Sequence, residues 1–166
     1  MKKYEWKRDG VRCWDEQNDN DESGKNHVLL ETKIEGGNFS HAGEGSSKLK
    51  SAMKKLGIEH SLIKRSAISV YEAEMNVVIH ASQGKMVSEI TRKKVHTVVK
   101  DEGDGIKDIQ KAMKPGFSTA SEEVREMGFG AGLGFVNIKR NTDKLLIKTR
   151  EGKGTRIEMT ICLEKN

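Results

Sequence analysis

The chain has 166 residues, which is enough for one domain with a buried core. A third of the residues are charged and the formal net charge is +5. No apolar run approaches the roughly 18 residues of a membrane-spanning helix, and the N-terminus lacks the apolar centre of a signal peptide. We therefore expect a cytoplasmic domain that does not bind a membrane.

Short basic clusters occur at "KLKSAMKK" and "TRKK". We interpret them as solvated faces of helices and strands, because aromatic residues are scarce and do not alternate with the basic ones. This argues against direct nucleic-acid binding. Attraction to an acidic partner protein or to nucleotide phosphate stays open.

Residues 1–26 read as a flexible N-terminal tail, since "DEQNDNDESGKN" is polar and has no periodicity. The folded domain is expected over 27–166. Cys13 and Cys162 lie at opposite ends of the chain and fit neither a disulfide framework nor a zinc site, so we assign them no role.

The first predicted elements are a strand and two helices. A strand is expected in "HVLLETKIE", where Leu30, Thr32 and Ile34 share one side. A helix follows, capped by Ser46 or Ser47 and stopped by Gly57. A second helix is expected over 61–81, with apolar residues on almost every side, which indicates burial.

Two alternating strands follow in "KMVSEITRKKVHTVVKD", and a glycine-dense connection then extends from 101 to 134. After it come a helix in "LGFVNIKRNTD" and two strands joined by a turn at "EGKG". Helices on one face of a sheet are expected from this order. The predicted fold is an α+β two-layer sandwich with a mixed β-sheet.

The second helix contains "YEAEMNVVIHA", in which Glu72, Asn76 and His80 are each four residues apart. Residues at this spacing share one helix face. A polar line on an otherwise apolar helix predicts that this face meets something polar.

Glycines clustered before a helix N-terminus are typical of a phosphate site, because backbone N–H groups can approach the anion there. The spacing in "GFGAGLGF" excludes the dinucleotide fingerprint, and no Gly-Lys pair is followed by Ser or Thr as a P-loop requires. The protein-kinase motifs H-R-D and D-F-G are absent.

Four motifs in order, Glu-x-x-x-Asn, "DEGDGI", "GFGAGLGF" and "KGT", resemble those of the GHKL (histidine-kinase-like) ATPase superfamily. The resemblance extends from about residue 28 to 163 and implies the Bergerat-type ATP-binding fold. Among its groups the chain is most similar to the anti-sigma regulatory factors. These are small Ser/Thr switch kinases that control sigma factors through STAS-domain antagonists.

The resemblance implies ATP and Mg²⁺ as cofactors. Asn76 would ligate Mg²⁺ through its side-chain oxygen, a suitable ligand for a hard cation. Glu72 would orient or deprotonate the attacking hydroxyl. His80 is expected to be structural or to support the residues that contact the nucleotide.

Adenine and sugar contacts are implied for a second group of residues. Asp101 would accept a hydrogen bond from the adenine amino group. Gly103 and Gly105 would allow the backbone to approach the base and sugar. Thr155 would lie beside the adenine.

The lid over ATP and the phosphate loop are also implied. Ser118 and Thr119 would lie in the lid, and Arg125 would reach the γ-phosphate from it. The glycines that would wrap the phosphates are Gly130, Gly132 and Gly134.

The function implied is a Ser/Thr protein kinase that transfers the γ-phosphate of Mg-ATP to a serine of a STAS-domain protein. A first alternative is an anti-sigma factor that sequesters a sigma factor with an affinity set by ATP. A second is a nucleotide-sensing subunit with little or no turnover. Homodimerisation is implied by the resemblance alone.

Overall fold

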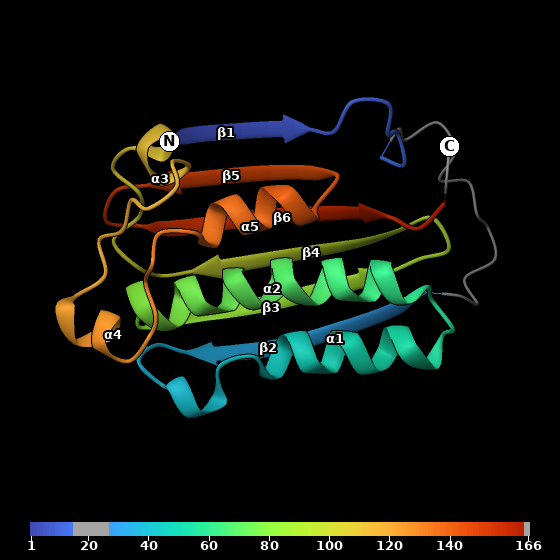
Figure 1. The fold of residues 1–166 in the computed structure, drawn as a ribbon, viewed down its shortest axis with the longest axis horizontal. Coiled ribbons are helices and arrows are strands. Elements are labelled where there is room, and N and C mark those ends of the chain that lie inside the picture. The colour runs from blue at the N-terminus through green and yellow to red at the C-terminus, as the bar shows by residue number, and fades with distance from the viewer. Residues whose placement is uncertain (15–26, 165–166) are drawn as a thin grey trace.

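A computed structural model describes residues 1–14 and 27–164, and it forms two layers: a six-stranded sheet and the helices on one of its faces (Figure 1). The strands are β1 (Lys2–Lys7), β2 (Val28–Glu35), β3 (Gln83–Ile90), β4 (Lys94–Asp101), β5 (Lys144–Arg150) and β6 (Gly154–Cys162). The α-helices are α1 (Glu44–Lys55), α2 (His60–His80), α3 (Ile109–Ala112), α4 (Glu122–Glu126) and α5 (Gly134–Asn141). None of the helices in the described ranges has the length and hydropathy of a membrane span.

The strand order is β1-β5-β6-β4-β3-β2, and each neighbouring pair is antiparallel. The α+β two-layer sandwich is thus confirmed, but a mixed sheet was the wrong expectation. Two helices separate β2 from β3, so the chain reverses direction three times and β3 runs antiparallel to β2. Helices α3, α4 and α5 lie between β4 and β5 in the chain, and β6 separates these two parallel strands in the sheet.

The N-terminus corrects the prediction of a tail. Residues 2–7 form β1, which pairs with β5 at the sheet edge. Tyr4 and Trp6 pack against the core on the helix side, and the Lys139 ammonium lies 5.9 and 5.4 Å from their ring centroids. Residues 15–26 of the predicted tail lie outside the described residues. The first strand therefore belongs to the domain that was expected to begin at residue 27.

The two cysteines also acquire a structural role that the sequence did not indicate. Cys13 and Cys162 form a disulfide, with their Cα atoms 5.6 Å apart. Close by, the buried Asp143 carboxylate accepts hydrogen bonds from Arg8 Nε (3.0 Å), Arg65 Nη2 (2.8 Å) and the backbone N–H of Cys162 (2.8 Å). The segment after β1 is therefore fixed to α2 and to β6.

Helix α2 lies over the middle of the sheet between α1 and α5 (Figure 1). Its core side contains apolar residues such as Val70, Ala73 and Val77, each at most 1% exposed. Two serines on this side, Ser66 and Ser69, donate their hydroxyls to backbone carbonyls about one turn earlier, so they are buried without unpaired donors. The predicted burial of this helix is confirmed.

The start of α1 differs from the prediction. Gly43 is its N-cap residue, and Ser46 lies in the first turn, where its hydroxyl donates to Gly43 O. The backbone N–H groups of Gly45 and Ser46, which have no carbonyl acceptor within α1, instead donate to the Glu74 carboxylate of α2, at 3.1 and 2.6 Å. Glu74 is only 2% exposed, and burial raises the pKa of its carboxyl against the lowering effect of these bonds. A side chain distant in sequence therefore caps α1.

We expect Glu74→Ala to lower the free energy of unfolding by about 2–4 kcal/mol, because two buried N–H groups lose their acceptor. Urea unfolding followed by circular dichroism measures this. Glu44→Ala is the matched control: it removes an exposed carboxylate from the same helix end and should cost less than about 1 kcal/mol. Equal losses in the two variants would contradict the capping role.

Candidate functional site

Most of the predicted site residues lie at one end of the molecule. The C-terminal half of α2, the N-terminus of α5 and the segment with α4 meet there, on the left in Figure 1. β4 ends in Asp101 and β6 begins at Gly154, and these two strands are neighbours. The fold thus brings together motifs that extend from Glu72 to Thr155 in the sequence.

Glu72 and Asn76 both face the first residue of α5. A side chain at Gly134 would place its first carbon 3.4 Å from Glu72 Oε2 and 3.6 Å from Asn76 Oδ1. Both side chains are half-buried, whereas His80, one turn further on, is exposed. The absence of a side chain at Gly134 thus leaves space between the polar line of α2 and the N–H groups that begin α5.

Asn76 also carries an unexplained buried group. Its Nδ2 is buried and has no hydrogen-bond partner within the described part of the chain. Native proteins rarely leave such a donor unpaired, because its desolvation is not compensated. A ligand with oxygen acceptors at the start of α5 would satisfy this donor. Asn76 Oδ1, on the same amide, is a suitable ligand for a hard cation shared with phosphates.

Asp101 organises the other part of the site. Its Oδ1 accepts the backbone N–H groups of Gly103 (2.8 Å) and Thr155 (3.2 Å). Gly154 adopts a φ of +103°, and a side chain there would collide with the Asp101 carbonyl. Only glycine therefore allows the start of β6 to approach the end of β4 this closely.

The second oxygen of Asp101 accepts no hydrogen bond from the described residues, so it is available to a donor on a ligand. Burial raises the pKa of the Asp101 carboxyl, and the two backbone hydrogen bonds partly oppose this. The Thr155 hydroxyl pairs with that of Thr149 at 3.0 Å, and Thr149 Oγ1 also accepts the N–H of Ile106 (2.8 Å). The chain after Gly105 is thereby connected to the same strand ends.

The predicted lid residues form a local hydrogen-bond network. Arg125 Nη2 donates to Ser118 O (2.9 Å), and Ser118 Oγ accepts the N–H of Ala120 (3.1 Å). Thr119 and Arg125 are exposed. In this structure the guanidinium of Arg125 therefore binds within the predicted lid, and among the described residues it forms no hydrogen bond with Glu72 or Asn76.

Of the three predicted phosphate-loop glycines, only Gly134 faces the polar line of α2. Gly132 O accepts the N–H of Gly116 (3.0 Å), and a side chain at Gly130 would meet Ala120. Gly130 and Gly132 thus pack against the lid. The ring of Phe129 stacks on Phe39 with centroids 5.1 Å apart, which links the lid to the segment after β2.

One residue of the site was missed by the sequence analysis. Asn137, on α5, donates from Nδ2 to Glu72 Oε1 at 3.1 Å. It lies three residues after Gly134 and is the only uncharged polar side chain in "GFVNIK". A polar residue in the first turn of an amphipathic helix was the signal in the sequence that could have identified Asn137.

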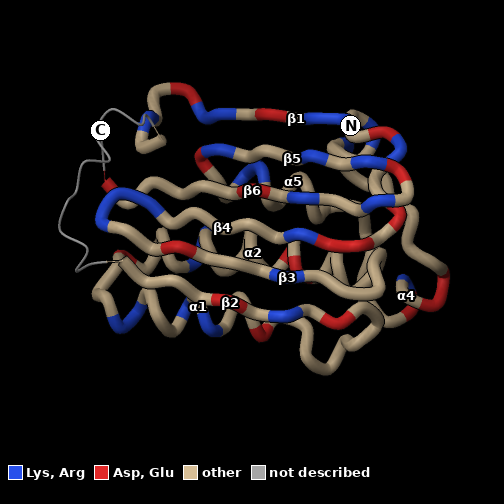
Figure 2. Tube along the Cα trace, turned by 180° about the vertical axis from the view of Figure 1, so that it is seen from behind, with Lys and Arg blue, Asp and Glu red and all other residues tan. Residues whose placement is uncertain are grey.

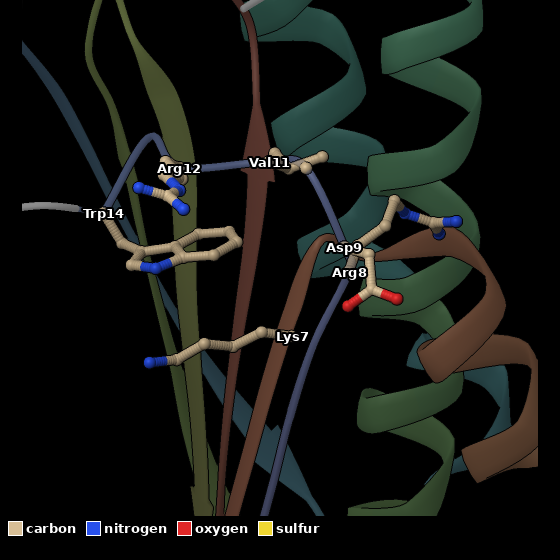
Figure 3. Close-up of a pocket in the computed structure, with 7 residues that line it drawn as sticks. Lys7, Arg8, Asp9, Val11, Arg12 and Trp14 are labelled. Carbon is tan, nitrogen blue, oxygen red and sulfur yellow. The ribbon is translucent and has the colours of Figure 1, made fainter.

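A further pocket lies away from these residues. It is formed by the segment after β1, with Lys7, Arg8 and Trp14 among its lining residues (Figure 3). No predicted site residue lines it.

Comparison with known proteins identifies the family. The sequence profile described as "Histidine kinase-like ATPase domain" matches residues 40–161, which include the polar line of α2, Asp101 and the phosphate-loop glycines. This chain belongs to that family. The family is one of ATPases, which implies ATP binding by this domain.

The relatives belong to the anti-sigma regulatory group. An anti-sigma F factor from Caldanaerobacter subterraneus is 38% identical over 103 residues, covering 59% of this chain and 68% of the relative. The serine/threonine-protein kinase RsbT of Bacillus subtilis is 31% identical over 109 residues, covering 63% of this chain and 76% of the relative.

A solved structure supports the fold alone. The RsbU and RsbW domains of a Mycobacterium tuberculosis protein match with a TM-score of 0.57 at 15% identity, covering 84% of this chain and 33% of that one.

We expect Asp101 to make ATP binding by this histidine kinase-like domain pH-dependent. As the pH falls through its raised pKa, the carboxylate gains a proton and becomes a weaker acceptor, so ATP affinity should fall. Asp101→Asn stays neutral, and should bind ATP about 10-fold more weakly at neutral pH with a flatter profile. Isothermal titration of both proteins across the acidic range measures this. Titration of the ATP phosphates affects both proteins equally. If ATP affinity changed with pH in the same way in the wild type and in Asp101→Asn, the proposed role of Asp101 in ATP binding would be excluded.

We expect Asn137→Ala to lower the turnover of ATP by about 10- to 100-fold, because Glu72 loses the donor that fixes its orientation. The dissociation constant for ATP should change little. Asn141→Ala, one turn further along α5, is the control. Equal effects on kcat and on ATP affinity would indicate a general distortion of α5 instead.

Proposed function

We propose that this chain is a Ser/Thr protein kinase that transfers the ATP γ-phosphate to a serine of a STAS-domain antagonist. The observation that carries the proposal is the position of Glu72, whose carboxylate is oriented by Asn137 beside the N-terminus of α5. A protein that only binds ATP has no need of an oriented carboxylate at this place. The similarity to RsbT, a named serine/threonine-protein kinase, supports the same reading.

The roles of the residues follow from their chemistry. Asp101, through its available oxygen, would accept the adenine amino group, and the N–H groups at the start of α5 would bind phosphate oxygens. Asn76 would hold Mg²⁺, which supplies charge neutralisation on the transferred phosphoryl group. Glu72 would orient the serine hydroxyl and accept its proton.

Arg125 would contribute only if the lid rearranged. Its guanidinium now donates to Ser118 O, and it would have to exchange this bond for a phosphate oxygen. Lid closure is a common way to complete a catalytic site after the substrate has bound. We assign Arg125 this second state, with Ser118 and Thr119 in the moving segment.

A second candidate function is an anti-sigma factor that binds a sigma factor directly. It is favoured by the name of the 38% identical relative, an anti-sigma F factor. Both functions use the same ATP site. They differ in whether phosphate leaves ATP for a serine or the nucleotide state sets the affinity for a partner.

The test follows the γ-phosphate. Wild type and Glu72→Gln are incubated with γ-labelled Mg-ATP and a lysate of the source organism. We expect a small protein to be labelled on serine by the wild type only, while Glu72→Gln, which keeps the shape but cannot accept a proton, still binds ATP.

Asn76→Ala should lose Mg-ATP binding, which equilibrium dialysis measures.

The other outcomes are informative. Label that stays on ATP with both proteins would exclude the kinase and favour the anti-sigma factor, for which an ATP-dependent pull-down is the next measurement. Full Mg-ATP binding by Asn76→Ala would contradict the site assignment itself.

A further inference from the structure

A straight row of basic residues crosses the sheet on the face that the helices leave open. Each of the six strands contributes one residue, and the strand register places them opposite one another. In order from β2 to β1 they are Lys33, Lys85, Lys100, Arg156, Lys148 and Lys3. We call this set the basic row. Figure 2, which views the sheet from behind, shows Lys and Arg positions on every strand.

The alternation of burial shows that the basic row faces away from the helices. Met86, Val99, Ile147 and Ile157, each next to a member of the row, are at most 3% exposed and belong to the core. Successive side chains of a strand point to opposite faces. The described helices lie on the other face (Figure 1), so the row is open to contact.

Like charges directly opposite each other destabilise a sheet. Three members of the row are compensated by nearby glutamates: Lys85 by Glu31 (3.2 Å), Lys3 by Glu5 (3.2 Å) and Arg156 by Glu158 (2.8 Å). The other three, Lys33, Lys100 and Lys148, form no ion pair in the described part of the chain. The sheet therefore carries an electrostatic cost that an acidic ligand would remove.

The spacing of the row identifies the ligand. Six strands about 4.8 Å apart span about 24 Å. An α-helix laid across them, with one acidic side chain per turn of 5.4 Å, spans about 27 Å over the same five intervals, within the reach of lysine side chains. An extended chain repeats a face every 6.6–6.8 Å or so and would span about 34 Å, out of register with the strands.

We propose that the open face of the sheet binds an acidic α-helix of a partner protein, oriented across the strands with one carboxylate over each member of the basic row. This inference does not depend on the nucleotide site, which lies on the opposite side of the sheet. It also opposes face-to-face packing of two copies of this chain, because their basic rows would meet.

The neighbouring row favours a helix over a broad polyanion. Two residues further along the strands the register aligns Glu31, Val87, Val98, Glu158, Leu146 and Glu5. A membrane or a nucleic-acid duplex would cover both rows and meet three carboxylates. A helix can place its acidic stripe on the basic row and turn neutral or basic side chains toward the glutamates.

The test compares two triple variants of the full chain. The row variant is Lys33→Gln, Lys100→Gln and Lys148→Gln. The control variant, Lys50→Gln, Lys54→Gln and Lys64→Gln, removes the same charge from exposed positions on α1 and α2. The row variant should melt no lower than the wild type, because it relieves repulsion. A third variant with arginine at the three row positions retains the charge.

The probe is a labelled, alanine-rich helical peptide of about 20 residues with one glutamate per turn. Fluorescence anisotropy at low salt should show binding to the wild type, the control variant and the arginine variant. The row variant should bind about 10-fold more weakly. A peptide of the same composition with glutamates on all sides should bind weakly to every protein.

Three results would overturn the proposal. One is the absence of peptide binding to the wild type, and a second is an equal loss in the row and control variants, which would reflect net charge alone. The third is tighter, row-dependent binding of single-stranded DNA or of phosphatidylserine vesicles than of the peptide, which would identify a phosphate surface.

Discussion

The position of helix α2 is the constraint on which the rest of the structure depends. The sheet lies beneath it, with α1 on one side and α5 on the other. Nearly all of its surface must therefore be apolar, or its polar groups must form hydrogen bonds within the protein. Ser66 and Ser69 meet this demand by bonding to their own helix, and Glu74 meets it by capping α1. The polar line at Glu72 and Asn76 is tolerated because α5 begins there with a glycine and N–H groups.

The candidate nucleotide site is assembled from the ends of elements and not from their middles. Asp101 ends β4, Gly154 begins β6 and Gly134 begins α5. Backbone N–H groups that have no partner within their own element are concentrated at such ends, and they supply fixed donors without additional side chains. The predicted lid is different, because its Arg125–Ser118 bond is internal to it and it contacts the segment after β2 through the stacking of Phe129 on Phe39.

The open face of the sheet is as much a product of the fold as the site is. β1 adds a sixth strand at one edge, fixed through Tyr4, Trp6 and the disulfide of Cys13, and it completes the basic row with Lys3. The two faces of the sheet thus differ: the helix-covered face carries the candidate nucleotide site and the open face presents charge. A protein that couples a nucleotide state to a partner can use such an arrangement, since both faces share the same strands.

The sequence by itself determined the local elements and the order of the motifs. The strands from residue 28 onward and helices α1, α2 and α5 follow from hydrophobic periodicity and glycine stops, and Glu72 with Asn76 follows from their spacing of four. These signals are local, so they are written in neighbouring residues. Tertiary structure decided what depends on contacts between distant residues: β1, the disulfide, the antiparallel sheet, the Glu74 cap and the Asn137–Glu72 bond. The basic row belongs to the same class, because its six members extend from residue 3 to 156 and only strand register aligns them.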